Sequence, residues 1–296
     1  MNKDYSLEEN VTHGTKLQPI RCIRFSTGKG TAYPERFFVQ RHWHHSCEIL
    51  RILKGKFTIE IDLERYELRE GDICIVGSGE LHQLEGKGPE TLHDVIIFNP
   101  HILEFSYVDQ FQEDVIAPIL SQKYALPHLL RPGEAAYDRV LKEYDKITKH
   151  SENQYFESKL GLLIIMNELK KNNCFIKTSR IQNEAEKLRV DRYKTLISYM
   201  EEHFMEKVTL DELGRLAGCN TQYLCHFFKE ISGVSPVQYL IEYRISQAQN
   251  MLMHTTKSIL EVSLDCGFDN VSYFIRQFRK YTGMTPGKYR RTNLYT

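Results

Sequence analysis

Four side chains that could bind a metal ion lie in the first third of the sequence: His42, His44, Glu48 and His82. Imidazole nitrogens together with a carboxylate form a donor set that binds Fe, Mn, Ni or Zn. Because His42 and His44 are two residues apart, they would point to the same face of a β-strand. The same groups could instead line a pocket for a small polar effector, or could be hydrogen-bonded structural residues. The sequence therefore predicts a polar site and leaves open a divalent transition metal, an organic effector, or neither.

Short β segments surround this site and must position it. Between Pro19 and about Pro100 the sequence contains CEILRILKG, KFTIEID, YELREGDICIV and TLHDVIIF, separated by clusters of Gly, Asp and Glu. Several short strands in series favour a sandwich or a barrel. A barrel could bring Glu48 and His82 beside the first two histidines.

The last third of the sequence contains an internal duplication. FFKEISGVSPVQY (227–239) aligns with QFRKYTGMTPGKY (277–289) at one constant offset. A repeat of this kind predicts a repeated structural unit. The two copies share a capping box, a turn glycine and an asparagine N-cap, at Thr209, Gly218 and Asn220 in the first copy and at Ser258, Gly267 and Asn270 in the second.

Each copy is therefore predicted to form a helix, a turn and a second helix. The second helices have apolar stripes at spacings of three and four, made of Leu224, Phe227, Phe228 and Ile231 in one copy and Phe274, Phe278 and Tyr281 in the other. A helix over 236–252 would join the copies and could set two recognition helices about one DNA turn apart. The sequence thus predicts two helix-turn-helix units that bind double-stranded DNA.

The residues outside the apolar stripes are the candidate DNA contacts. They are Thr221, Gln222, Cys225, His226 and Lys229 in the first unit, and Asn270, Val271, Ser272, Ile275, Arg276, Arg279 and Lys280 in the second. Arg276 lies one turn after Ser272 and could reach a guanine edge, whereas Arg279 and Lys280 lie nearer the helix end and are assigned to phosphates. Residues 270–296 hold six cationic side chains and no acidic one, and we expect these cations to meet phosphates.

GFDNVSYFIRQFRKYTGMTPGKYR, in the second unit, resembles the signature of the AraC/XylS family of bacterial transcription regulators. The resemblance covers about the last hundred residues. It implies a seven-helix DNA-binding domain, with base or phosphate contacts from Gln222, His226, Ser272 and Arg276. In the first unit, Cys225 and His226 stand where the family often has stronger hydrogen-bonding or cationic side chains.

The N-terminal segments resemble both halves of the cupin motif. The matching pattern is His42-x-His44-x3-Glu48-x6-Gly55 followed by Gly71-x5-Gly77-x-Gly79-x2-His82. Gly77 stands where the motif usually has proline, and Gly86 where it usually has asparagine. The resemblance implies a cupin-like barrel whose mouth holds a metal or, as in sensor domains of the AraC/XylS family, a small effector such as a sugar.

The whole chain has 296 residues, with 41% apolar and 26% charged residues, which allows two domains. It starts without a basic and then apolar leader, and its apolar runs are too short for a membrane span, so we expect a cytoplasmic protein with no membrane contact. The cysteines are scattered and form no CxxC pair, which argues against a disulfide framework or a zinc ribbon. The predicted domains are 1–172 and 191–296, with a linker over 173–190.

Residues 101–190 carry helical patterns. The segment YFESKLGLLIIMNELKKN has a predicted apolar face at Leu160, Leu163, Ile164 and Asn167. This face could pack against the barrel, or, by the family resemblance, could form the interface of a homodimer.

The predicted fold class is α+β with two domains: a cupin-like β-barrel with trailing helices, then an all-α domain with two helix-turn-helix units. The predicted function is a sequence-specific DNA-binding regulator, not an enzyme, that responds to a small effector. We expect this effector to be a carbohydrate, because many members of the resembled family activate carbohydrate-use operons. Two alternatives stay open: a metal-dependent cupin enzyme that carries a DNA-binding module, and a constitutive regulator with a vestigial barrel.

Overall fold

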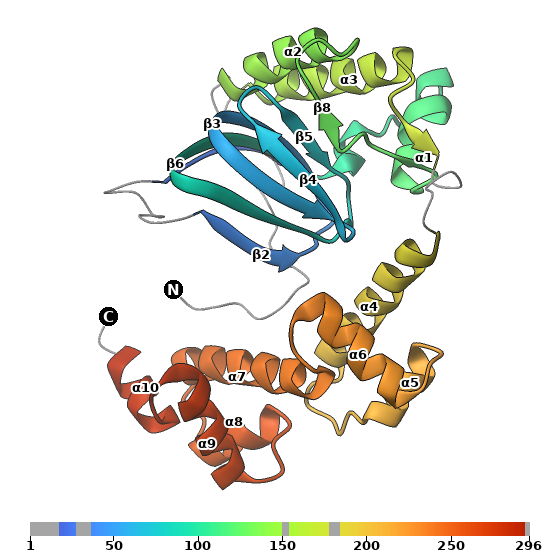
Figure 1. Ribbon diagram of the computed structural model, residues 1–296. Coiled ribbons are helices and arrows are strands. Elements are labelled where there is room, and N and C mark those ends of the chain that lie inside the picture. Colours follow the sequence, from blue (N-terminus) through green and yellow to red (C-terminus); the bar gives the residue numbers. More distant parts are fainter. Residues whose placement is uncertain (1–17, 28–36, 150–153, 178–183, 294–296) are drawn as a thin grey trace. The chain divides into compact units, whose positions relative to one another are not determined.

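The structure, a computed structural model, describes residues 18–27, 37–149, 154–177 and 184–293 (Figure 1). The chain divides into two compact units, with the boundary between Lys187 and Leu188. The first unit is built on a β-sheet, and the described part of the second consists of helices and their turns. Among the described residues, no helix is both long and apolar enough to cross a bilayer.

The first unit consists of one large sheet, two short paired strands and several helices (Figure 1). The sheet strands are β1 (Ile20–Ser26), β2 (Phe38–His42), β3 (Cys47–Ile61), β4 (Glu64–Arg69), β5 (Ile73–Val76), β6 (His82–Phe98) and β8 (Leu129–Leu130). The remaining elements are η1 (Pro100–Leu103), η2 (Gln112–Ile116), α1 (Ala117–Leu120), β7 (Tyr124–Ala125), α2 (Tyr137–Lys149), α3 (Tyr155–Lys171) and β9 (Ile176–Lys177). Strand β7 pairs with β9, although they lie far apart in the sequence.

The long strands β3 and β6 pair with each other and connect the two halves of the sheet. Residues 92–98 of β6 pair with β1, and residues 82–85 face β2. Strand β3 pairs with β5 in its first half and with β4 in its second half. Between these halves the register shifts around Gly55, whose φ is 88°. The predicted strands CEILRILKG and KFTIEID are therefore one strand, because the glycine forms a bulge and does not end the pairing.

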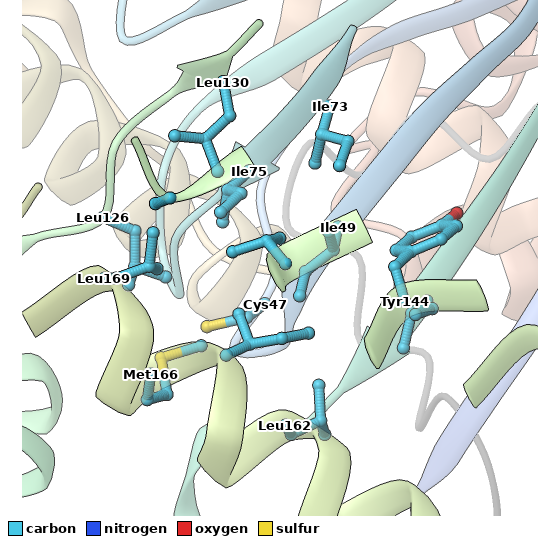
Figure 2. Packing of buried hydrophobic residues seen from close by; sticks show 14 of the residues in the cluster. Cys47, Ile49, Ile73, Ile75, Leu126, Leu130, Tyr144, Leu162, Met166 and Leu169 are labelled. Carbon is cyan, nitrogen blue, oxygen red and sulfur yellow. The ribbon is translucent and has the colours of Figure 1, made fainter. Parts of the chain in front are cut away.

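Both faces of β3 are covered, because alternate residues point to opposite sides. One set joins an apolar cluster inside the curved sheet, which contains Phe37, Leu50, Ile52, Phe57, Ile59, Ile61, Leu68, Cys74, Val76, Leu84, Val95 and Ile97. The other set, including Cys47 and Ile49, packs under helices α2 and α3 (Figure 2). By this alternation Glu48 shares its face with Leu50, on the inner side of the sheet.

Helix α3 contributes a different face to the core from the one predicted. Its fully buried apolar residues are Leu162, Ile165, Met166 and Leu169, which pack against Ile49 and Ile75 of the sheet (Figure 2). Leu160 in the predicted stripe is instead 47% exposed, and Phe156 is 72% exposed. The alternative in which this stripe packs against the barrel is therefore not met at Leu160, and the alternative of a dimer interface stays open. The helix is apolar on both sides, so spacing alone cannot identify the buried side.

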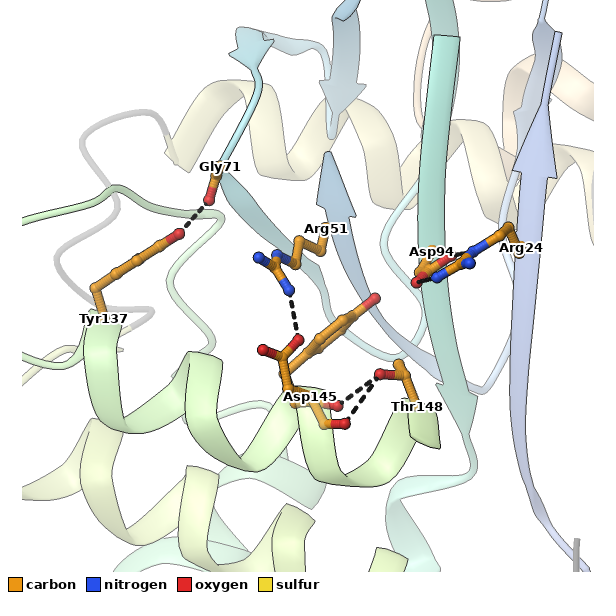
Figure 3. Close-up of polar contacts among 8 residues, drawn as sticks. Arg24, Arg51, Gly71, Asp94, Tyr137, Asp145 and Thr148 are labelled. Carbon is orange, nitrogen blue, oxygen red and sulfur yellow. Dashed lines mark hydrogen bonds and ion pairs between the residues drawn. The ribbon is translucent and has the colours of Figure 1, made fainter. Parts of the chain in front are cut away.

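Polar contacts hold α2 on the outer face of the sheet (Figure 3). The Tyr137 hydroxyl donates to the Gly71 carbonyl at 2.5 Å, and Arg51 of β3 forms an ion pair with Asp145 of α2. Beside them, Arg24 and Asp94 pair across β1 and β6 with two hydrogen bonds of 2.6 and 2.7 Å. The contacts of Tyr137 and Asp145 fix α2 against β3 and the turn before β5, and the pair of Arg24 and Asp94 joins β1 to β6.

The second unit contains seven helices in the described range: α4 (Glu184–Glu202), α5 (Leu210–Leu216), α6 (Thr221–Ser232), α7 (Pro236–His254), α8 (Ile259–Asp265), α9 (Val271–Thr282) and α10 (Pro286–Asn293). Helices α5 and α6 form the first helix-turn-helix, and α8 and α9 form the second (Figure 1). Helix α7 has 19 residues and is therefore about 28 Å long. This count equals the seven helices that the family resemblance implies.

The N-caps at which these helices begin are those predicted from the sequence. Thr209 and Ser258 form complete capping boxes, and the side chains of Asn220 and Asn270 cap α6 and α9. The predicted apolar stripes are buried, apart from Tyr281, which is half-buried. The predicted fold class, α+β with a sheet domain, trailing helices and a helical domain of two helix-turn-helix units, is confirmed.

The predicted linker, 173–190, contains more structure than expected. Residues 176–177 form β9, and helix α4 starts at Glu184 and places Val190 in the core of the second unit. The sparse apolar residues of the segment concealed this helix, because only Val190 in its described first turns is buried. Residues 178–183 lie outside the described part of the chain.

Candidate functional site

The structure brings the four predicted ligand residues together at one end of the sheet. His42 ends β2, His82 begins β6, and Glu48 is the second residue of β3. Nitrogen atoms of His42, His44 and His82 all lie within 4.8 Å of one another, and His44 Nε2 is 3.0 Å from Glu48 Oε1. His44 is not on a strand as predicted, because β2 ends at His42 and the chain then turns toward β3.

The backbone around the site orients all three imidazole rings in the same way. Each Nδ1 faces a backbone carbonyl two residues away: Gln40 at 2.8 Å from His42, Ser46 at 3.0 Å from His44, and Glu80 at 2.9 Å from His82. A proton on Nδ1 of His42 and His82 leaves their Nε2 lone pairs free for a metal, which is how metal-binding histidines are held, whereas His44 Nε2 donates to Glu48. Nε2 of His82 is buried and has no hydrogen-bond partner in the described part of the chain. The residues present therefore fit a divalent transition metal.

The electrostatics of the cluster also favour a cation. Burial would raise the pKa of Glu48, but the hydrogen bond from His44 and the electrostatic effect of the His82, His44 and His42 rings outweigh it and lower the pKa to about 2. Burial and the neighbouring charge of His42 lower the pKa of His82 to about 4. At neutral pH the site thus offers an ionised carboxylate and a neutral His82 imidazole, the protonation states that a metal requires.

A second polar chain adjoins the cluster and was not found from the sequence. His128, in the loop before β8, donates from Nε2 to Glu80 Oε1 at 3.1 Å and contacts the Tyr66 hydroxyl at 2.9 Å through Nδ1. Tyr66 in turn donates to Glu64 at 2.7 Å. Burial alone would lower the pKa of His128, but the hydrogen bond to Glu80 and nearby carboxylates raise it overall. Since the Glu80 carbonyl also accepts from His82, this chain supports the site from the side of β5.

The interior of the sheet beyond the cluster is apolar and holds one buried imidazole. His93 of β6 is 1% exposed and lies against three aromatic rings, with centroid distances of 4.6 Å to Phe37, 4.9 Å to Phe57 and 5.3 Å to Phe25. Its Nδ1 is buried and has no partner among the described residues, and burial lowers the pKa of His93 to about 4. Alternation with the inward Val95 could have indicated this position in the sequence.

The first predicted recognition helix, α6, exposes most of its candidate contacts. Gln222, His226 and Lys229 are exposed, whereas Thr221 and Cys225 are half-buried. Glu230 lies 3.9 Å from His226 and 2.8 Å from Arg189 of α4, which offsets its negative charge.

The second predicted recognition helix, α9, exposes Ser272, Ile275, Arg276, Arg279 and Lys280, with Val271 half-buried. The Asn270 side chain accepts from the Tyr273 backbone N–H at 2.9 Å, so its oxygen is already used as a cap. The Arg276 guanidinium lies 5.3 Å from the centre of the Tyr273 ring. This cation–π contact orients Arg276, and the spacing of three residues on a helix was its signal in the sequence.

One of the predicted phosphate cations has a different role. Arg290 of α10 donates to the backbone carbonyls of Leu252 at 3.4 Å and Lys257 at 2.5 Å. The Leu252 carbonyl lies in the last turn of α7, where carbonyls have no partner within the helix, and the Lys257 carbonyl lies in the loop before α8. Arg290 therefore holds the end of α7 to the start of the second helix-turn-helix.

Comparisons with known proteins agree with both parts of the structure. Residues 213–292 match the helix-turn-helix domain family, and residues 31–98 match the cupin domain family. An uncharacterized HTH-type transcriptional regulator, YdeC of Bacillus subtilis, is 26% identical over 98% of both chains. The HTH-type transcriptional activator RhaR of Escherichia coli O139:H28 is 26% identical over 88% of this chain and 90% of its own.

Among solved structures, the DNA-binding domain of AdpA in complex with a target DNA is 28% identical over 34% of this chain and 91% of its own, with a TM-score of 0.33. The sequence relatives are transcription regulators that match nearly the whole chain, and the two matched domains lie within the sheet unit and the helical unit. The chain combines an AraC-type helix-turn-helix domain with a cupin domain, and along nearly its whole length it is similar to transcription regulators.

Proposed function

We propose that the helical domain reads a specific double-stranded DNA site with α6 and α9 in successive stretches of the major groove. The observation that carries this proposal is the two-sided character of both helices. Each buries an aromatic stripe, with Phe228 and Phe278 at equivalent positions, and exposes polar or cationic side chains on the other side. The DNA-binding domain in this proposal is 191–296, preceded by the first turns of α4, and the effector domain is 1–172.

Selection of duplexes from a random pool by the full-length protein tests this function. Recovery of a sequence motif with two parts about one DNA turn apart is expected. Recovery of no preferred sequence would overturn the proposal.

Arg276 and Arg279 should have different roles on the selected site. Arg276→Ala should weaken binding by about 1–3 kcal/mol and relax the preference at one base pair, because Arg276 is held by Tyr273 toward the exposed side of α9. Arg279→Ala should weaken all sequences alike and reduce the slope of affinity against salt by about one unit. Titrations on the site and its single-base variants at several salt concentrations measure both. If Arg276→Ala weakens every sequence equally and flattens the salt dependence, Arg276 only holds a phosphate.

For the cupin domain we propose a small hydroxylated effector, a carbohydrate, bound at the histidine cluster. Among the described residues, the inner cluster of the sheet is apolar, whereas the histidine end offers acceptors and donors side by side. A sugar hydroxyl can donate to Nε2 of His82 and accept from a protonated neighbour. A thermal-shift screen of sugars on the full-length protein tests this proposal, because a ligand that binds only the folded state raises its apparent stability.

The same residues support a metal at this site. His42, His44, His82 and Glu48 would hold it, and a bound metal would supply a Lewis acid for hydroxyl oxygens of the effector. The protein's own part is to keep the imidazoles in one orientation through Gln40, Ser46 and Glu80. We propose that the domain binds its ligand without transforming it, since relatives that share nearly the whole chain are regulators. Turnover of a substrate by the metal-loaded protein would favour the alternative of a cupin enzyme with a DNA-binding module.

If the site holds a metal, the purified protein should contain about one transition-metal ion per chain. His82→Ala and His44→Ala should each remove it, because each deletes one imidazole ligand. His45→Ala is the matched control, since His45 is the exposed neighbour of His44 and should keep the metal. Elemental analysis after dialysis measures the content. A metal-free wild-type protein that still responds to an effector would contradict the proposed metal site but not the proposed effector pocket.

We also propose that the exposed side of α3 forms a homodimer interface, because Phe156 and Leu160 are both large, apolar and exposed on one helix. Leu160→Glu should convert a dimer to a monomer at micromolar concentrations, since a charge would be buried at the contact. Lys149→Glu on α2 is the control for a change of charge alone. Sedimentation analysis measures both variants. A wild-type protein that is monomeric under these conditions would contradict the proposed dimer.

A further inference from the structure

A contact between the two helix-turn-helix units involves neither recognition helix. Arg244, in the middle of α7, donates from Nε to the Phe204 carbonyl at 2.7 Å and from Nη2 to the Glu206 carbonyl at 2.6 Å. Both carbonyls belong to the segment between α4 and α5, at the entrance to the first unit. The Arg244 guanidinium also lies 5.7 Å from the centre of the Phe268 ring, in the turn of the second unit. One side chain therefore contacts both units.

Gly267 brings the second unit against the same carbonyl. A Cβ on Gly267 would lie 2.4 Å from the Phe204 carbonyl oxygen and 2.9 Å from Arg244 Nη2, so only a glycine allows this approach without a shift. Its φ of +74° is also one that glycine adopts most easily. We call Phe204, Arg244, Gly267 and Phe268 the junction.

The first copy of the repeat shows that the turn itself does not require this closeness. Gly218 is the turn glycine of the first unit and has a similar φ of +64°, but a Cβ there would meet no described atom within 4 Å. The two glycines therefore share the backbone requirement and differ in the contact between units. This difference makes Gly218 a matched control for Gly267.

The charge of Arg244 is committed to this contact. Burial lowers the pKa of Arg244, with the charge of Asp269 opposing that effect. The Arg244 guanidinium contacts two backbone carbonyls and an aromatic ring, so this side chain is suited to fixing the packing of these segments and not to reaching DNA. Helix α7 alone would still let each unit tilt about its ends, whereas the junction adds a second attachment between the units.

We propose that Arg244 and Gly267 are positioning residues that fix the distance and rotation between α6 and α9, so that the protein accepts one spacing between the two parts of its DNA site. This inference rests on the proposed reading of DNA by both helices. One inserted base pair moves the second part by about 3.4 Å and rotates it by about 34°, which rigidly linked units cannot follow.

The test uses full-length protein and duplexes from the random-pool selection, with one base pair inserted or removed between the two parts. Wild type should prefer the selected spacing by about tenfold. Arg244→Ala and Gly267→Ala should reduce this preference several-fold, while Arg244→Lys should retain part of it. Gly218→Ala should keep the wild-type spacing preference even if its affinity is lower, because it strains only its own turn.

Each outcome has a distinct meaning. If Gly267→Ala fails to fold, as judged by its thermal transition, Arg244→Ala carries the test alone. A folded Arg244→Ala protein with the wild-type spacing preference would overturn the inference, because it would show that α7 by itself sets the spacing. A wild type that tolerates inserted base pairs would also overturn it. If the selection yields no motif at all, the proposed DNA reading fails, which is a separate result.

Discussion

Replacing Phe278 with alanine should lower the free energy of unfolding of the helical unit by about 3–5 kcal/mol and remove its DNA binding. Phe278 is completely buried in α9, with ring centroids 5.6 Å from Phe274 and 5.4 Å from Tyr289. The variant loses the transfer energy of the ring and leaves a cavity beneath the recognition helix. A domain of this size has a total stability of only about 5–15 kcal/mol, so this loss is a large part of it.

Urea unfolding followed by helical signal measures the effect of Phe278→Ala. Phe228→Ala, at the equivalent position of the first helix-turn-helix, should have a similar effect. Phe228 is also fully buried, and its ring centroid lies 5.1 Å from that of Tyr193. Ile275→Ala is the control, because Ile275 is 36% exposed on the same helix as Phe278. A loss below about 1 kcal/mol for Phe278→Ala would mean that the core around α9 closes over the gap.

Acidification between pH 6.5 and 4 should destabilise the cupin domain by about 3 kcal/mol through His93 alone. In the folded protein burial lowers the pKa of His93 from 6.5 to about 4, with Glu48 and Asp94 opposing the shift. In this pH window the unfolded chain binds a proton that the folded domain excludes. The stability due to neutral His93 is therefore complete above pH 6.5 and is lost as the pH falls toward 4.

The variant His93→Leu separates this effect from the other carboxylates and histidines. It keeps a side chain of similar size among Phe25, Phe37 and Phe57 but cannot bind a proton. The difference in unfolding free energy between the two proteins, measured by urea at a series of pH values, should change steeply below pH 6.5. A difference that does not vary with pH would show that His93 is already solvated, or charged, in the folded state.

The helical domain could be predicted in detail because its determinants are local. A capping box needs an N-cap residue and a partner only three positions later. The boxes that begin at Thr209 and at Ser258 both form. The buried stripes of α6 and α9 follow from spacings within one helix. The contact of Arg244 with Phe204 could not be predicted in this way, since it depends on how three separate segments pack.

The cupin domain was predicted less completely, for the same reason. The histidine spacing indicated a cluster, but His44 lies in a turn and His128 reaches the site from a loop far along the chain. In α3, Leu160 and Leu162 are equally apolar, and only the position of the sheet decides which is buried. Pairwise spacing identifies the face of a helix only when one face is polar.

The unequal charges of the two recognition helices imply an order of arrival on DNA. Helix α9 exposes three cations, Arg276, Arg279 and Lys280, whereas α6 exposes one, Lys229, and the charge of Glu230 on α6 is offset by Arg189. Electrostatic attraction acts over a Debye length of about 8 Å at physiological salt, beyond the range of hydrogen bonds to bases. The second helix-turn-helix unit should therefore capture the duplex first and slide along it, and the short-range contacts of both units then decide where the sliding stops.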